Sequence, residues 1–188
     1  AMISTRLAGK RCLVTGGSRG LGRAMCEAFV DAGAKIAFTY STDDVDAEAS
    51  RAALIAKGAE PLVFKGSVAD SAHVTATIKA IVAAWGGIDV LVNNAGVTQI
   101  LPIALLEEAD WDQVMDVNAK GAYLMSRAVL KSMIRAKKLP SLKSLVSLQT
   151  CQVNRKTKIM DLNIDSPKPI RAGEELDLAR LDAYLKSA

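Results

Sequence analysis

Histidine and cysteine are both scarce in this chain of 188 residues. The only histidine, His73, is expected as an exposed residue in the first turn of a helix, and this excludes histidine metal clusters and Ser-His-Asp catalysis. The three cysteines, Cys12, Cys26 and Cys151, are an odd number in an apolar setting. They predict reduced thiols in a cytosol rather than a disulfide framework, and no metal site is expected.

Long apolar runs are missing as well, although 50% of the residues are hydrophobic. No run approaches the roughly 20 residues that a membrane-spanning helix needs. Residues 1–6 do not contain the apolar core of a signal peptide. The sequence therefore predicts a soluble, cytoplasmic protein that does not enter a membrane.

Aromatic residues make up only 4% of the chain, and its most basic part contains none. The net charge of +4 is concentrated in residues 131–171, where lysines and arginines face only two acids, Asp161 and Asp165. Proteins that bind single-stranded nucleic acid combine cations with aromatic side chains on which the bases stack. The basic block is therefore interpreted as a solvated face, and nucleic acid is not an expected partner.

A glycine-rich stretch, Thr15-Gly16-Gly17-Ser18-Arg19-Gly20-Leu21-Gly22, follows the apolar run 12–14 and precedes residues with a helical pattern. This order predicts a buried strand, a tight turn and a helix. The glycines allow the backbone to approach a ligand, and the helix start directs free N–H groups and partial positive charge at an anion. The stretch therefore predicts a phosphate cradle, although a glycine-rich turn alone fits an ordinary strand-to-helix connection equally well.

A second apolar strand, expected at 88–92, ends in Asn93-Asn94-Ala95-Gly96. An open parallel sheet binds its ligand in a crevice at the carboxyl ends of its strands. Two strand ends rich in small and amide residues therefore support one another as the two sides of a single crevice.

Together these two motifs resemble the classical short-chain dehydrogenase/reductase family, and in particular 3-oxoacyl-acyl-carrier-protein reductases. The resemblance extends from about residue 7 to about residue 138. It implies an α/β fold with a Rossmann-type doubly wound parallel sheet, truncated after about five strands. Residues 1–148 would form the dinucleotide-binding domain, and residues 149–188 a divergent tail with an extended segment and a terminal helix.

The expected elements follow from apolar periodicity and from helix caps. Strands are expected at 11–14, 35–40, 61–64, 88–92 and 144–148. The first helix is expected to end near residue 31, and the second to span 43–57. The third is expected to begin at Asp70 or Ser71, and the fourth to span about 107–137. In the last helix, Val114, Val117, Gly121, Leu124 and Ala128 are expected on one buried face. Trp111 and Met115 are interpreted as packing residues.

The resemblance assigns two polar residues to catalysis. Asn118 corresponds to an asparagine that supports an active-site water and the catalytic lysine, and its alternative interpretation is a tolerated polar residue on the helix. Ser147, or alternatively Thr150, lies near the position of the catalytic serine. The Tyr-x-x-x-Lys pair of the family is absent, because Tyr184 is followed by Lys186 after only two residues. Tyr184 receives no catalytic role.

The resemblance also assigns a nicotinamide cofactor. The end of the second strand carries no acid, Asp43 and Asp44 fit a helix start, and Arg19 is well placed to meet a 2′-phosphate. NADP(H) is therefore predicted in preference to NAD(H). The predicted cofactor-binding residues are Gly16, Ser18, Arg19, Gly20, Leu21, Gly22, Tyr40, Ser41, Ser67, Val68, Asn94, Ala95 and Gly96, with Asn93 expected beside the adenosine ribose.

Two functional hypotheses follow from the sequence. The first is an NADP(H)-dependent oxidoreductase for a small-molecule carbonyl or hydroxyl substrate, impaired by the absence of the Tyr-x-x-x-Lys pair. The second is a non-catalytic nucleotide-binding or interaction protein derived from the same family. In both cases the resemblance implies a homo-oligomer that pairs through the helix at 107–137.

Overall fold

The computed structural model describes residues 7–99, 103–135 and 145–147. The chain divides into two compact units, Ala1–Gln152 and Val153–Ala188, and every described residue lies in the first. The predicted domain boundary at residue 148, Thr150, Cys151, the greater part of the basic block and the predicted tail helix all lie outside the described residues.

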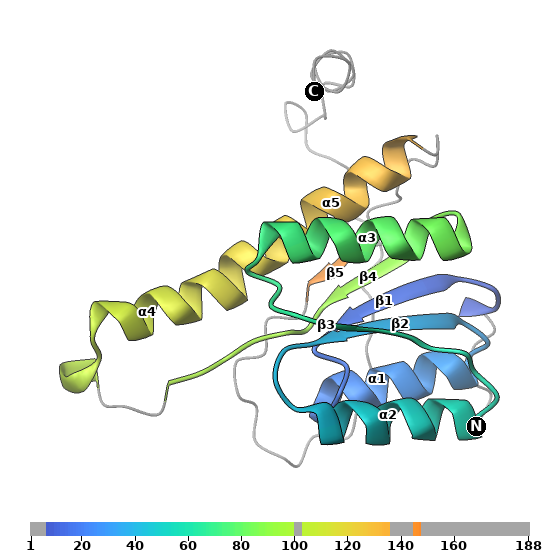
Figure 1. Cartoon of the computed structure of the whole chain (residues 1–188), viewed down its shortest axis with the longest axis horizontal. Helices are drawn as coiled ribbons and strands as arrows, with labels where there is room; N and C mark the ends of the chain where they lie inside the picture. The colour runs from blue at the N-terminus through green and yellow to red at the C-terminus, as the bar shows by residue number, and fades with distance from the viewer. Residues whose placement is uncertain (1–6, 100–102, 136–144, 148–188) are drawn as a thin grey trace, which may run out of the picture. The chain divides into compact units, whose positions relative to one another are not determined.

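Five parallel strands form one sheet in the order β3-β2-β1-β4-β5 (Figure 1). The strands are β1 (Arg11–Thr15), β2 (Lys35–Tyr40), β3 (Leu62–Lys65), β4 (Val90–Asn93) and β5 (Leu145–Ser147). Because β1 pairs with both β2 and β4, the chain builds the sheet outward from β1 first in one direction and then in the other. The predicted doubly wound parallel sheet is confirmed. Its topological switch point lies where β1 pairs with β4.

Helices cover both faces of this sheet (Figure 1). Helices α1 (Gly20–Asp31) and α2 (Asp44–Ala56) lie on one face, and α3 (Ser71–Trp85) and α5 (Ala122–Arg135) lie on the other. The short 3-10 helix η2 (Ile103–Leu105), α4 (Glu108–Met115) and the π-helix η3 (Asp116–Gly121) precede α5. Asp43 caps α2 by accepting from the amide of Asp46, and Asp70 caps α3 by accepting from the amide of Ala72.

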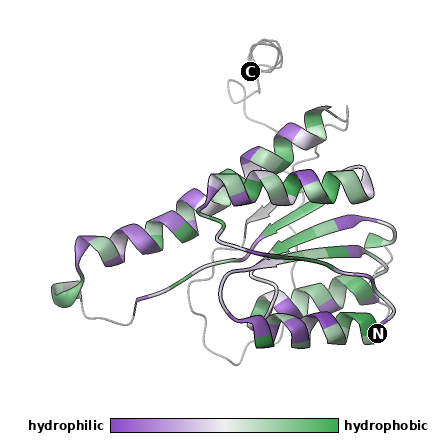
Figure 2. Cartoon of the chain, in the orientation of Figure 1, coloured by the Kyte–Doolittle hydropathy of each residue, from purple (hydrophilic) through white to green (hydrophobic). Residues whose placement is uncertain are grey.

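The core consists of two apolar layers, one on each side of the sheet. Successive strand side chains point to opposite faces, so alternate residues of one strand enter different layers. Cys12, Val14, Ile36 and Phe38 pack against α1 and α2, whereas Leu13, Ala37, Leu91, Met125 and Val129 share a layer with α3. Figure 2 shows the strands as largely hydrophobic, as expected for a sheet that is covered on both faces.

A π-helix, η3, interrupts the long helix that the sequence predicts. On η3 and α5 the buried residues are Gly121, Met125, Val129 and Met133. Val117, Leu124 and Ala128 of the predicted face are partly buried and pack against the same core cluster. The predicted face is therefore confirmed at these positions, whereas Met125, Val129 and Met133 were not predicted.

Three predictions about individual side chains were also wrong. Trp111 and Met115 are 59% and 42% exposed, because α4 runs beyond the sheet and has no buried residue (Figure 1). His73 is half-buried rather than exposed, and its imidazole occupies the space next to Gly66. A ring nitrogen of His73 also shares a hydrogen bond of 3.3 Å with the hydroxyl of Thr77.

A partly buried ion pair joins the amino end of β1 to the segment just before β4. The Arg11 guanidinium donates from Nε and Nη2 to the two carboxylate oxygens of Asp89, at 2.7 Å each, and from Nη1 to the carbonyl of Trp85. The side chains are only 13% and 20% exposed, and the bond to Asp89 raises the pKa of Arg11. A side chain at Gly87 would collide with this guanidinium. The pair thus links the amino-terminal ends of the two central strands.

We expect Arg11→Met to lower the free energy of unfolding by about 2 kcal/mol, because it removes the charged donor to both carboxylate oxygens of the partly buried Asp89. Urea denaturation followed by circular dichroism measures this. The control is Lys57→Met, which removes the partly exposed Lys57–Asp31 pair (2.8 Å) and should cost less than about 1 kcal/mol. Equal losses in the two variants would contradict the structural role of Arg11.

The thiols of Cys12 and Cys26 are both fully buried, and burial raises the pKa of each to about 12. Because only the thiolate reacts with alkylating agents, neither should be modified by iodoacetamide in native protein at pH 8. Both should be modified after denaturation in urea. Peptide mass spectrometry assigns each site separately, and rapid native modification of either cysteine would show that its layer of the core is open.

Candidate functional site

A cleft with a volume of about 530 Å³ lies at the carboxyl ends of the strands, at the switch point of the sheet. Its walls come from the glycine-rich turn, from the segments after β2, β3 and β4, and from the helical segment before α5. The lining residues are Gly16, Ser18, Arg19, Leu21, Gly22, Thr39, Tyr40, Ser41, Thr42, Asp43, Gly66, Ser67, Val68, Asn94, Ala95, Gly96, Val97, Gln113 and Val117.

The glycine-rich turn has no room for a side chain at Gly17 or at Gly22. Gly16 has φ of +67°, a left-handed conformation that favours glycine. A side-chain carbon at Gly22 would overlap the carbonyl of Gly16, and one at Gly17 would overlap Phe38. The turn therefore packs directly on β2 and on the first turn of α1. Its backbone is left accessible from the cleft.

Hydrogen bonds join the two sequence motifs at the bottom of the cleft. The Asn94 amide nitrogen Nδ2 donates to the carbonyls of Thr15 and Gly16, at 2.9 and 3.1 Å. The Thr15 hydroxyl accepts from the backbone amides of Asn94 and Ala95, both at 2.9 Å, and donates to the carbonyl of Val92. The shape of the turn after β1 is therefore set by the residues that follow β4.

Asn93 does not lie in the cleft, contrary to the sequence prediction. It is 5% exposed, and its Nδ2 donates to the hydroxyl of Ser126 in α5 at 3.0 Å. The reason is the alternation of strand side chains, which places Asn93 on the same face as Leu91, toward α5, while Asn94 turns toward β1. Within the described part of the chain, Asn93 Oδ1 is buried with no hydrogen-bond partner.

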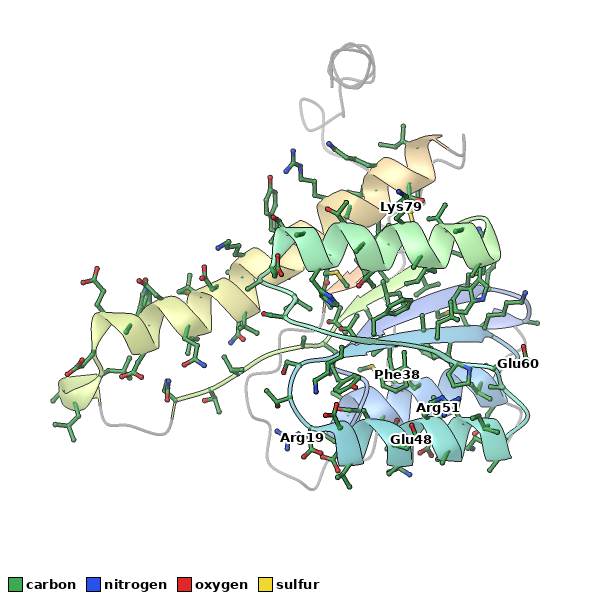
Figure 3. The ribbon with its side chains drawn as sticks, in the orientation of Figure 1. Arg19, Phe38, Glu48, Arg51, Glu60 and Lys79 are labelled. Atoms are coloured by element: carbon green, nitrogen blue, oxygen red, sulfur yellow. The ribbon has the colours of Figure 1, made fainter. Side chains whose placement is uncertain are left out.

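The rim of the cleft beside α2 carries several charged groups. The side chain of Arg19 is 76% exposed (Figure 3). Its guanidinium lies 3.8 Å from the carboxylate of Asp46 in the first turn of α2. The Tyr40 hydroxyl donates to Asp44 Oδ1 at 2.8 Å, and Lys65 Nζ donates to Asp44 Oδ2 at 2.6 Å. The bond from Lys65 and the bond from Tyr40 both lower the pKa of the Asp44 carboxyl. The bond to Asp44 also raises the pKa of the Tyr40 hydroxyl.

The wall after β3 consists of Gly66, Ser67 and Val68. The Ser67 hydroxyl accepts from the amide of Ala69 at 3.2 Å, which folds the segment into a turn before α3. Val68 is buried and packs against Gly121, where an added side chain would overlap it. The π-helix thus packs against this wall at Val68.

The segment after β4 is fixed to the π-helix by Asn118. Its Oδ1 accepts from the amide of Val97 at 2.8 Å, and its Nδ2 donates to the carbonyl of Val97 at 2.9 Å. Gln99 adds a hydrogen bond to Asp110 in α4 at 3.0 Å. The Asn118 side chain therefore holds Val97 and is not among the residues that line the cleft. Ser147 ends β5 as the register partner of Asn93.

Every predicted cofactor-binding residue except Gly20 and Asn93 lines the cleft, and the binding role of these residues stays a prediction. The sequence analysis missed the lining residues Thr39, Thr42, Asp43, Gly66, Val97, Gln113 and Val117. Several of these lie at or directly after the ends of predicted strands, and this position could have identified them as lining residues. Gln113 and Val117 come from a helix whose position depends on tertiary contacts, and Lys65 was not singled out at all.

The described part of the chain contains no group of three or more His, Cys, Asp or Glu side chains that could hold a metal ion. Among the described helices, none is both long and apolar enough to span a membrane.

Residues 10–139 match the sequence model of the family described as short chain dehydrogenase. The chain is 37% identical over 126 residues to 3-oxoacyl-[acyl-carrier-protein] reductase FabG of Staphylococcus aureus, covering 67% of this chain and 51% of that protein. It is 40% identical over 134 residues to D-threitol dehydrogenase of Mycolicibacterium smegmatis, covering 70% and 50%. The chain thus spans about half the length of the curated relatives it matches.

Solved structures agree with these matches. A metagenomic short-chain oxidoreductase in complex with NADP has a TM-score of 0.66 and 35% identity, covering 72% of this chain and 61% of that chain. A short-chain type dehydrogenase/reductase from Mycobacterium marinum, with a TM-score of 0.71 and 24% identity over 76% of this chain and 56% of that one, shares the fold. The matched region includes both motifs of the cleft, and the chain belongs to the short-chain dehydrogenase/reductase family.

Proposed function

We propose that this chain binds NADP(H) in the cleft at the switch point and acts as an oxidoreductase on a small carbonyl or hydroxyl substrate. The observation that carries the proposal is the glycine-rich turn before α1, whose carbonyls at Thr15 and Gly16 accept hydrogen bonds from Asn94. A dinucleotide pyrophosphate binds at such a turn, against free amides and the positive end of a helix. The relative solved with NADP supports the choice of a nicotinamide cofactor.

The residues present fit a phosphorylated dinucleotide. The first turn of α1 contains no acidic residue that would repel a pyrophosphate, and the absence of a side chain at Gly16 and Gly22 lets the backbone approach it. Arg19 is exposed on the rim, where it could bond a 2′-phosphate. Tyr40, Ser41, Ser67 and Val68 would enclose the adenosine, while Ala95 and Gly96 would line the path toward the nicotinamide.

The chemistry that this cofactor supplies is hydride transfer. The contribution of the chain itself is to bind, to orient and to provide a proton. We propose that the last of these is impaired, because none of the tyrosines Tyr40, Tyr123 and Tyr184 has a lysine four residues later. The Tyr40 hydroxyl is moreover committed to Asp44. Asn118 and Ser147 are proposed as the polar residues nearest to the reaction.

A second candidate function is a non-catalytic nucleotide-binding or interaction protein. Its support is the number of exposed apolar side chains in and around α4, where Leu105, Trp111, Met115 and Tyr123 are each more than 40% exposed. Exposed apolar groups of this kind are typical of protein interfaces. We propose that a second copy of the chain pairs through the helical segment 107–137, which would bury them.

We expect NADPH to bind to the purified chain and Gly22→Ala to weaken this binding at least about 10-fold. The added methyl group would displace the Gly16 carbonyl and with it the bond from Asn94. Isothermal titration calorimetry measures both constants. Ala24→Ser, an exposed change on the same helix, is the matched control and should bind as the parent chain does. Equal affinities for G22A and A24S would contradict the proposed cradle.

Oxidation of NADPH in the presence of β-keto esters tests the catalytic part. A missing general acid typically costs about 10² to 10⁴ in rate, so we expect turnover that is slow but above a no-enzyme blank. Absorbance at 340 nm measures it, with the nucleotide-free chain as a second blank. Binding without any turnover would favour the second candidate function, and sedimentation velocity would then be expected to show a dimer rather than a monomer.

A further inference from the structure

Ser50 is a buried polar residue of α2 whose hydroxyl bonds outside its own helix. The residue is fully buried, and its Oγ donates to the carbonyl of Gly17 at 3.0 Å. Serine and threonine hydroxyls on helices commonly donate to a carbonyl one turn earlier, as Thr75 does to Ser71 in α3. Ser50 instead bonds a residue 33 positions away, and this bond joins α2 to the glycine-rich turn.

Gly17 is held from two sides. Its amide donates to the carbonyl of Thr39 near the end of β2 at 3.0 Å, and its carbonyl accepts from Ser50. A side-chain carbon at Gly17 would overlap Phe38, so the residue lies directly against β2. Both polar backbone groups of Gly17 therefore fix the turn, one through β2 and the other through the hydroxyl of Ser50.

The bond from Ser50 also sets the orientation of the next amide. The peptide between Gly17 and Ser18 is trans, and in a planar trans peptide the carbonyl and the following N–H point in opposite directions. Because the Gly17 carbonyl is held toward α2, the Ser18 amide is directed away from α2. Ser18 lines the cleft, and within the described part of the chain neither its amide nor its hydroxyl has a hydrogen-bond partner. Two donors at Ser18 therefore remain for a ligand.

The same bond connects two walls of the cleft. Helix α2 begins directly after its cap, Asp43, which lines the cleft together with Ser41 and Thr42. The glycine-rich turn, which includes Ser18, forms a neighbouring wall. Ser50 lies in the second turn of α2, so its bond to the glycine-rich turn holds these two walls in a fixed relation.

We propose that Ser50 is a positioning residue for phosphate binding in the cleft. By holding the Gly17 carbonyl, its hydroxyl keeps the Ser18 amide in the orientation in which it can donate to a phosphate oxygen of the dinucleotide. A donor that is already ordered in the free protein costs less to order when the ligand binds. Ser50 is not among the residues that line the cleft, so it acts through Gly17. This inference rests on the proposed binding of NADP(H).

The test compares the dissociation constants of NADPH and of adenosine for the parent chain and for Ser50→Ala. Alanine favours a helix and is smaller than serine, so circular dichroism should show a folded variant. Without the hydroxyl the Gly17–Ser18 peptide can turn, and we expect NADPH to bind about 5-fold more weakly. Adenosine has no phosphate group, so its dissociation constant should change by less than about 2-fold. NMR titrations measure both constants.

Ser126→Ala is the matched control. It also removes a serine hydroxyl from a helix, where Oγ accepts a bond of 3.0 Å from Asn93 of the sheet, but neither residue lines the cleft. Its dissociation constant for NADPH should stay within about 2-fold of the parent.

Three results would overturn the inference. If S50A binds NADPH as tightly as S126A and the parent do, Ser50 has no positioning role and the proposed function stands. An equal loss for NADPH and adenosine would show that the hydroxyl stabilises the cleft as a whole rather than a phosphate donor. If the folded parent chain does not bind NADPH, the proposed function fails and the role of Ser50 with it.

Discussion

The hydrogen bonds between Asn94 and the backbone of Thr15 and Gly16 are the interaction on which the cleft depends. They connect two parts of the chain that are almost eighty residues apart, and they do so where the sheet reverses its winding direction. A glycine-rich turn has little structure of its own, because glycine loses more conformational freedom on folding than any other residue. Here the missing order comes from the Asn94 amide and the Thr15 hydroxyl, both of which are buried and bonded. The shape of the cleft therefore depends on the pairing of β1 with β4.

The sequence was sufficient for the parts of the fold that depend on local chemistry. Strand positions followed from short apolar runs, and the start of α3 followed from the capping side chain of Asp70. The cleft could be predicted because parallel strands bring their carboxyl ends to one edge, whatever the helices do. Asn93 shows the limit of this reasoning. Two adjacent asparagines end β4, and only the geometry of the strand decides that one faces α5 and the other the glycine-rich turn.

The remaining errors arise where tertiary contacts override the sequence pattern. No residue type marks the π-helix at 116–121, and the buried Met125 and Val129 of α5 were not predicted. The bonds from Asn118 to Val97 occur at this turn and tie it to the segment after β4. Lys65 was equally invisible, since its partner Asp44 lies on another element and only the register of β2 and β3 brings them together.

The nucleotide binding and the proton transfer proposed above depend on different parts of the sequence. The residues that line the cleft run from Gly16 to Val117, within the region that matches the family. The proton donor of the family, in contrast, belongs to a tyrosine and lysine pair that these 188 residues do not contain. None of the hydrogen bonds that shape the glycine-rich turn involves such a pair, so its absence leaves the described cleft unchanged. The nucleotide binding and the turnover that we propose therefore depend on different residues, and evidence for one is not evidence for the other.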